Sequence, residues 1–119
     1  MSKKILIIED DTFLQGLAAN KLGDAGFDVT TASDGDEAVT ELSNEKFNCI
    51  LLDLMLPDIS GFDILKSIRE TSKSLPVIVF SNLSDDKDIK KALDLGATDY
   101  LVKSNFTLEE LVEKIEKTI

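Results

Sequence analysis

Short apolar runs alternate with helical patterns along the whole chain, and this alternation most constrains the fold. Between the runs, apolar residues recur at the spacing of an amphipathic helix, which predicts inward faces that include Leu17, Val39 and Leu93. Strict strand–helix alternation implies right-handed strand–helix–strand units and a parallel sheet with helices on both faces. Most runs are continuously apolar, as is typical of strands covered on both sides.

The predicted elements account for nearly all of the chain. The runs predicted as strands are residues 4–10, 27–32, 48–53, 77–81 and 98–103. The segments predicted as helices are residues 12–26, 34–45, 61–70, 84–96 and 107–119. Ser84 is the expected cap of the fourth helix, and Thr107 with Glu110 forms a capping box at the fifth. A chain of 119 residues has the size of one domain, so residues 1–119 are predicted to form a single unit.

The charge and composition narrow the chemistry. The chain carries 13 Lys and Arg against 23 Asp and Glu, a net charge of −10, so we expect no direct binding to nucleic acid or to an anionic membrane. It contains no His and a single cysteine, Cys49, which excludes His-based acid–base catalysis, a zinc site of the usual ligands and an internal disulfide. One apolar, unpaired cysteine fits a reducing compartment, and we predict a cytoplasmic protein.

Polar residues gather where the predicted strands end. Asp53 follows the apolar run Ile50–Leu52, although Asp is depleted in strands and rarely buried without a partner. The first strand ends in Glu9 and Asp10, and the fifth ends in Lys103. Ligands of open parallel sheets bind beyond the carboxyl ends of the strands. We therefore expect these acids and this base to share one pocket.

Neighbouring carboxylates repel each other unless a cation lies between them. A site of hard oxygen ligands suits Mg²⁺, which prefers one or two carboxylates together with waters and a phosphate. The sequence therefore predicts that Asp10 and Asp53 share a magnesium ion within reach of Lys103. Asp11 has the simpler interpretation of a helix cap. Ser81 and Tyr100 would each be unremarkable if considered alone.

Four motifs together identify a family resemblance. They are "ILIIEDD", "LLDLMLPDISGFD", "VIVFS" and "GATDYLVK", in this order and at this spacing. With them the chain resembles, over essentially its full length, the receiver domain of two-component response regulators. The resemblance implies an α/β fold of the flavodoxin-like (βα)5 type, a doubly wound parallel sheet with strand order 2-1-3-4-5.

The resemblance also implies roles for individual residues. Asp53 matches the phosphoacceptor, and Asp10 matches the acid that binds Mg²⁺ directly. Glu9 matches the acid that reaches the metal through a water molecule, and Met55 would add its backbone carbonyl to the metal shell.

Further matches concern the phosphoryl group and the response to it. Ser81 matches the hydroxyl that moves to meet the phosphoryl group, Lys103 the ammonium that pairs with its oxygens, and Tyr100 the aromatic whose rotamer follows.

Two positions depart from the family pattern. Ser104 replaces the usual proline, so we predict a trans Lys103–Ser104 bond. Asn82 replaces a small residue and is placed either to crowd the pocket or to hydrogen-bond the phosphoryl group.

The implied function is a phosphorylation-dependent signalling switch and not an enzyme acting on a separate substrate. The donor would be a phosphohistidine on a sensor histidine kinase or a histidine phosphotransfer protein. Phosphorylation would shift the surface of the fourth helix, fifth strand and fifth helix to a state that binds partners. The signal would then be received by a downstream protein or by a C-terminal effector domain.

Three alternative interpretations make different demands on the sequence. A receiver-like adaptor would bind partners without phosphorylation, and the departures at Asn82 and Ser104 favour it. An Asp-nucleophile phosphohydrolase would need a proton donor two residues after Asp53, where this chain has Met55. A flavin-binding protein is disfavoured because the loop after the first strand is acidic and would repel the cofactor's phosphate.

Overall fold

A parallel sheet with strand order β2-β1-β3-β4-β5 lies at the centre of the molecule. The computed structural model describes residues 2–119. The strands are β1 (Lys4–Ile8), β2 (Asp28–Ala32), β3 (Cys49–Leu52), β4 (Val77–Ser81) and β5 (Asp99–Val102). The helices are α1 (Thr12–Asp24), α2 (Gly35–Asn44), α3 (Gly61–Thr71), α4 (Asp86–Asp94) and α5 (Leu108–Thr118), with a short 3-10 helix η1 (Lys103–Asn105) after β5. The predicted flavodoxin-like (βα)5 fold and its strand order are confirmed.

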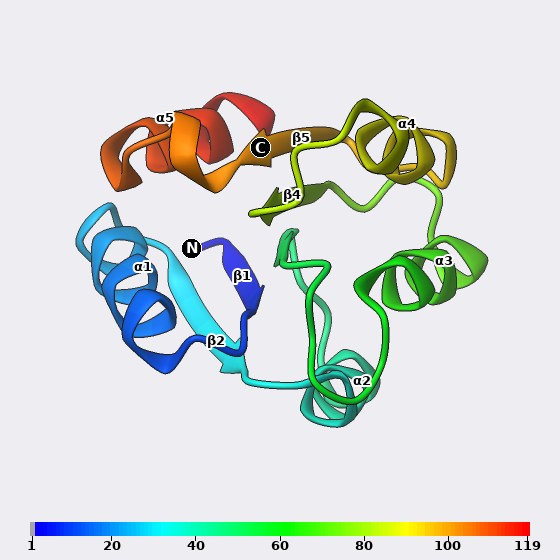
Figure 1. Cartoon of the computed structure of the whole chain (residues 1–119). Helices are drawn as coiled ribbons and strands as arrows, with labels where there is room; N and C mark the ends of the chain where they lie inside the picture. Colours follow the sequence, from blue (N-terminus) through cyan, green and yellow to red (C-terminus); the bar gives the residue numbers. More distant parts are fainter. Residues whose placement is uncertain (1) are drawn as a thin grey trace.

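The helices cover both faces of the sheet. Figure 1 shows α1 and α5 on one side and α2, α3 and α4 on the other. Successive residues of β1 serve opposite faces: Ile5 and Ile7 pack with the cluster under α1 and α5, whereas Leu6 and Ile8 pack with the cluster under the other three helices. This two-sided burial explains why the central strands contain no polar alternation.

The strand register brings two chain segments to the same edge. Ile8 pairs with Leu52 of β3 on one side and with Ala32 of β2 on the other. The ladder continues one step further, because the Asp53 N–H donates to the Ile8 carbonyl at 2.9 Å. The residues that follow β1 and β3 therefore emerge side by side, where the strand order reverses direction.

Helix caps agree with the sequence at two helices and differ at one. Asp11 caps α1, and Thr107 with Glu110 forms the predicted capping box of α5. The prediction for α4 is wrong: the N-cap is Asp85 and not Ser84, and no side chain caps it. The helix begins one residue later than Ser84 requires, and acidic residues in its first turn stabilise its positive end instead.

Three apolar side chains predicted to face inward lie outward. Leu17, Val39 and Leu93 are 39%, 47% and 46% exposed. Adjacent helical residues differ by about 100° in direction, so both members of a neighbouring pair cannot face the sheet squarely. The adjacent alanines take the inward positions: Ala18, Ala38 and Ala92. Within residues 2–119, no helix is long and apolar enough to cross a membrane.

Candidate functional site

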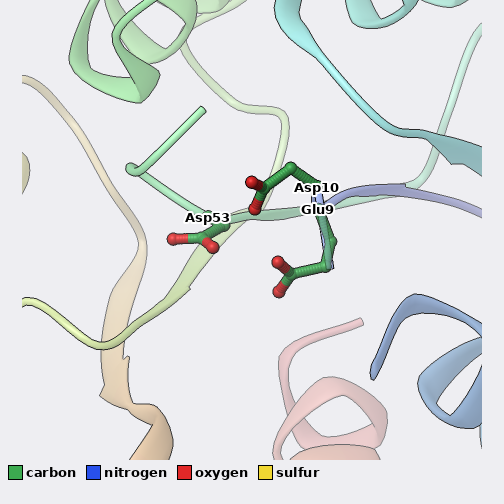
Figure 2. A group of neighbouring side chains, drawn as sticks. All are labelled: Glu9, Asp10 and Asp53. Atoms are coloured by element: carbon green, nitrogen blue, oxygen red, sulfur yellow. The ribbon is translucent and has the colours of Figure 1, made fainter. Parts of the chain in front are cut away.

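Three carboxylates meet beyond the ends of β1 and β3. Oxygens of Glu9, Asp10 and Asp53 all lie within 4.8 Å of one another. Figure 2 shows the side chains of Glu9 and Asp10, from the end of β1, and of Asp53, from the end of β3, gathered around one space. Glu9 and Asp53 are buried, whereas Asp10 is exposed. The register of β1 and β3 thus produces the predicted acidic cluster.

Lys103 joins two of these carboxylates. Its Nζ lies 2.6 Å from Oε1 of Glu9 and 2.9 Å from Oδ2 of Asp53. Burial lowers the pKa of Lys103, but the hydrogen bonds with Glu9 and Asp53 outweigh burial, so the pKa lies above its ordinary value. A charged ammonium therefore partners Asp53 at the end of the buried strand β3, which makes this buried carboxylate tolerable.

Glu9 has an unusual affinity for a proton. Burial raises the pKa of Glu9 to about 7; Lys103 opposes this shift, and the negative charge of Asp53 adds to it. Its second oxygen accepts an N–H from Asp11 at 3.2 Å. Burial, a like charge and a cation thus compete at one carboxyl group.

The predicted site residues divide into two sets. An open cavity is lined by the acidic cluster, Lys103, Met55 and Asn82, among others. The Met55 N–H donates to Oδ1 of Asp53 at 3.1 Å, so the loop after β3 also holds the Asp53 carboxylate. Ser81 and Tyr100 are not among the cavity-lining residues.

Ser81 and Tyr100 are linked to each other through Leu83. The buried Ser81 Oγ accepts the Leu83 N–H at 3.3 Å, and the Tyr100 hydroxyl donates to the Leu83 carbonyl at 2.7 Å. The loop that follows β4 therefore contacts both predicted switch residues. The Lys103–Ser104 bond is trans, as predicted.

Sequence reasoning missed two side chains that support this site. Gln15 donates from Nε2 to the carbonyl oxygens of Glu9 and Ala32, at 2.9 and 3.2 Å, and so joins the ends of β1 and β2. Asp58 accepts three backbone N–H groups, two of them from the first turn of α2. Both contacts join segments distant in sequence, so local patterns gave no signal for them.

The acidic cluster fits a magnesium ion. All its side-chain ligand atoms are carboxylate oxygens, two of the three residues are buried, and the separation of the oxygens permits a shared cation. Mg²⁺ is a hard cation that prefers such ligands, and its charge would relieve the repulsion between the carboxylates.

The strand order and the acidic cluster at the ends of β1 and β3 are those expected of the family that the sequence resembles. The sequence matches the response regulator receiver domain over residues 5–116. The chain therefore belongs to the receiver domain family of response regulators.

Individual relatives agree with this assignment. The chain is 39% identical to the transcriptional regulatory protein CrdR of Helicobacter pylori, over 98% of this chain and 55% of CrdR. It is 37% identical to the alkaline phosphatase synthesis transcriptional regulatory protein PhoP of Bacillus subtilis, over 87% of this chain and 43% of PhoP. The chain thus spans about half the length of the curated relatives it matches.

Solved structures show the same fold. A CheY-like receiver domain protein from Methanospirillum hungatei superposes with a TM-score of 0.93 at 28% identity, covering 98% of this chain and 93% of that one. Residues 5–116 thus match a receiver domain of the two-component response regulators, with an acidic cluster that could hold a metal ion.

Proposed function

We propose that this protein is a signalling switch in which Asp53 accepts a phosphoryl group in the presence of Mg²⁺. The observation that carries the proposal is the contact of Lys103 with both Asp53 and Glu9, beside the exposed Asp10. A carboxylate that already lies beside a fixed ammonium and two further acids has the surroundings that phosphoryl transfer needs.

In the proposed reaction, an oxygen of Asp53 attacks the phosphorus of a phosphohistidine on a partner. A P–O bond forms, the P–N bond breaks, and the imidazole nitrogen keeps the bonding pair. When bound, Mg²⁺ supplies positive charge for the phosphoryl oxygens. Asp10 and Asp53 would hold the ion directly, Glu9 through water, and Met55 through its backbone carbonyl. Lys103 would give up its contact with Asp53 or Glu9 and form a hydrogen bond to a phosphoryl oxygen instead.

The response would pass through the loop after β4. A phosphoryl group adds about −1.5 to −2 charge and three acceptor oxygens. Ser81 would turn toward these oxygens and give up the Leu83 N–H, which it now accepts. Tyr100, which is hydrogen-bonded to Leu83, would then change its rotamer. The surface of α4, β5 and α5 would shift toward its partner-binding state. Asn82 lines the cavity and would contact the phosphoryl group.

The proposed partners follow from this chemistry. The donor is a sensor histidine kinase or a histidine phosphotransfer protein, since the chain contains no histidine of its own. The output is contact with a downstream protein or an effector domain, and the only reaction is phosphorylation and dephosphorylation of the protein itself. Residues 1–119 would act as a single unit in this function. A cytoplasmic location and the lack of direct binding to nucleic acid or membranes remain predictions.

Intact-protein mass spectrometry after incubation with acetyl phosphate and Mg²⁺ tests the proposal. We expect a single phosphoryl adduct that requires Mg²⁺ and is absent from Asp53→Asn. Asp10 and Asp11 offer a matched pair, because they are neighbours but only Asp11 is committed to a helix cap. Asp10→Asn should lose most of the Mg²⁺-dependent adduct, whereas Asp11→Asn should retain it.

The same experiment distinguishes the alternative function. If neither acetyl phosphate nor a phosphorylated kinase modifies the protein, phosphorylation is not its mode of action. The chain would then act as a receiver-like adaptor that binds partners in a single state, with Asn82 occupying the cavity.

A further inference from the structure

The loop between β3 and α3 is fastened to the N-terminus of α2 by one carboxylate. Oδ1 of Asp58 accepts the Gly35 N–H at 2.8 Å and the Ile59 N–H at 2.8 Å. Oδ2 accepts the Asp36 N–H at 3.0 Å. Both oxygens of Asp58 are therefore engaged by backbone, and this acid is not part of the metal-capable cluster of Glu9, Asp10 and Asp53 among residues 2–119.

These hydrogen bonds complete the capping of α2 from outside the helix. The helix's own N-cap, Asp34, accepts only the Glu37 N–H, at 2.8 Å. Without Asp58, the N–H groups of Gly35 and Asp36 would lack protein partners. The hydrogen bond from the Gly35 N–H, together with those from Asp36 and Ile59, holds the pKa of Asp58 below its ordinary value.

Close packing accompanies the hydrogen bonds. A Cβ added at Gly35 would lie 2.8 Å from Cβ of Ile59, so the loop and the helix start already touch. At the far end of the loop, the Gly61 N–H donates to the Leu54 carbonyl at 3.0 Å. The segment 54–60 is thus held from two sides, and Met55 lies between the anchors.

Met55 connects this anchoring to the reacting group. It lines the cavity, and its N–H donates to Oδ1 of Asp53 at 3.1 Å. A shift of the loop would therefore displace the backbone assigned to the metal shell and release the Asp53 carboxylate from one of its two bonds.

We propose that Asp58 is a positioning residue for the metal site: by tying the β3–α3 loop to the start of α2, it sets the Mg²⁺ affinity of Asp53 and Met55 without touching the ion. This inference rests on the proposed function. It also assigns α2 a role as the fixed support of the loop, although α2 contributes no side chain to the acidic cluster.

Three variants distinguish the loss of the hydrogen bonds that join the loop to α2 from the loss of a negative charge and from the loss of a helix cap. Asp58→Ala removes the tie. Asp58→Asn removes the charge but keeps one oxygen that can accept the Gly35 and Ile59 N–H groups. Asp34→Ala removes a charge and a cap from the same helix but leaves the loop attached. For each we would measure Mg²⁺ affinity by calorimetry, unfolding by urea, and hydrogen exchange of residues 54–60 without Mg²⁺.

We expect Asp58→Ala to weaken Mg²⁺ binding about tenfold, as for residues that orient a metal ligand, and to speed exchange in the loop. Asp58→Asn should stay near the parent protein in both measurements. Asp34→Ala should lose stability comparable to Asp58→Ala but retain Mg²⁺ affinity. If Asp58→Ala does not fold, Asp58→Ser, whose single hydroxyl cannot accept all three N–H groups, takes its place with the same expectations.

Several outcomes would overturn the inference. One is unchanged Mg²⁺ affinity in Asp58→Ala; another is equal weakening in Asp34→Ala, which would point to helix stability alone. Equal weakening in Asp58→Asn with normal loop exchange would point to charge alone. Failure of the proposed function is separately visible, because the parent protein would then form no adduct at Asp53 with acetyl phosphate.

Discussion

The Tyr100 hydroxyl donates a 2.7 Å hydrogen bond to the carbonyl oxygen of Leu83, whose N–H donates to the Ser81 hydroxyl. A single residue in the loop after β4 is thus bonded to an aromatic on β5 and to the hydroxyl at the end of β4. The position of Tyr100 and the conformation of this loop are therefore coupled, and phosphorylation at Asp53 would act on both.

Tyr100→Phe should uncouple the loop from β5 while leaving the proposed phosphorylation site intact. Loss of one hydrogen bond should lower the free energy of unfolding by about 1 kcal/mol. The yield of phosphoryl adduct should be unchanged, but its effect on hydrogen exchange of α4 and β5 should shrink. Exchange measured with and without acetyl phosphate checks this, and an undiminished response in the variant would contradict it.

The raised pKa of Glu9 predicts an inverted pH dependence of stability in the metal-free protein. The pKa of Glu9 is about 7 in the folded state against an ordinary value of 4.5, so between these values the folded state binds a proton that the unfolded state has released. Stability from this group is complete below the lower value and is lost as pH rises toward 7, by about 3 kcal/mol in total.

Urea unfolding in EDTA across pH 4.5 to 7 would measure this contribution. Glu9→Gln should remove that part of the slope, because its amide does not titrate. The difference between parent and variant is the relevant quantity, since other acids titrate in both. Parallel pH profiles would contradict a raised pKa of Glu9 in the folded state.

Sequence patterns predicted the fold well because they report on burial and chain direction. Apolar runs that alternate with helices, most of them covered on both sides, require a parallel sheet, and its topology then brings Asp10, Asp53 and Lys103 to one edge. Periodicity was less informative about side-chain direction. Leu17 and Val39 fit the helical spacing of apolar residues but lie outside the buried face of their helices. The neighbouring alanines occupy that face, where a small side chain permits closer packing against the sheet.

Contacts between distant loops were not predictable from local pattern. Asp58 follows Pro57, and the pair is typical of an ordinary turn, yet two of its three partners lie more than twenty residues earlier, at the start of α2. The misplaced cap at Ser84 has a similar origin: a local preference names several candidates, and tertiary packing chooses among them.

Removal of Lys103 should destabilise the metal-free protein and make it more dependent on Mg²⁺. Lys103→Met leaves the buried carboxylates of Glu9 and Asp53 without their cation, which should cost about 3 kcal/mol. Because Mg²⁺ supplies the missing positive charge, it should stabilise the variant more than the parent. Thermal unfolding with Mg²⁺ or EDTA would measure both effects.

A matched control comes from a lysine on the surface. Lys114 pairs with Asp99 at 2.8 Å, but both side chains are substantially exposed. Lys114→Met should therefore cost less than about 1 kcal/mol and show the parent's response to Mg²⁺. Equal losses in the two variants would mean that the buried pair has no special role.

The start of α3 fits against the backbone that follows β3 so closely that only glycine is accommodated. A Cβ at position 61 would lie 2.4 Å from Cα of Leu54 and 2.7 Å from the carbonyl oxygen of Asp53, and both are backbone atoms that cannot rotate away. Gly61→Ala must therefore push α3 away from the loop or displace Asp53. We expect a loss of about 2–3 kcal/mol in unfolding free energy and a slower phosphorylation by acetyl phosphate.

Gly16→Ala provides the opposite expectation within the same fold. Gly16 lies inside α1, and an added Cβ would meet no atom within 4 Å. Alanine should there raise the free energy of unfolding by about 0.5–1 kcal/mol through its helix propensity, with unchanged phosphorylation. Urea unfolding and the rate of adduct formation in both variants test the argument. Equal stability in the two would show that α3 does not press on the Asp53–Leu54 backbone.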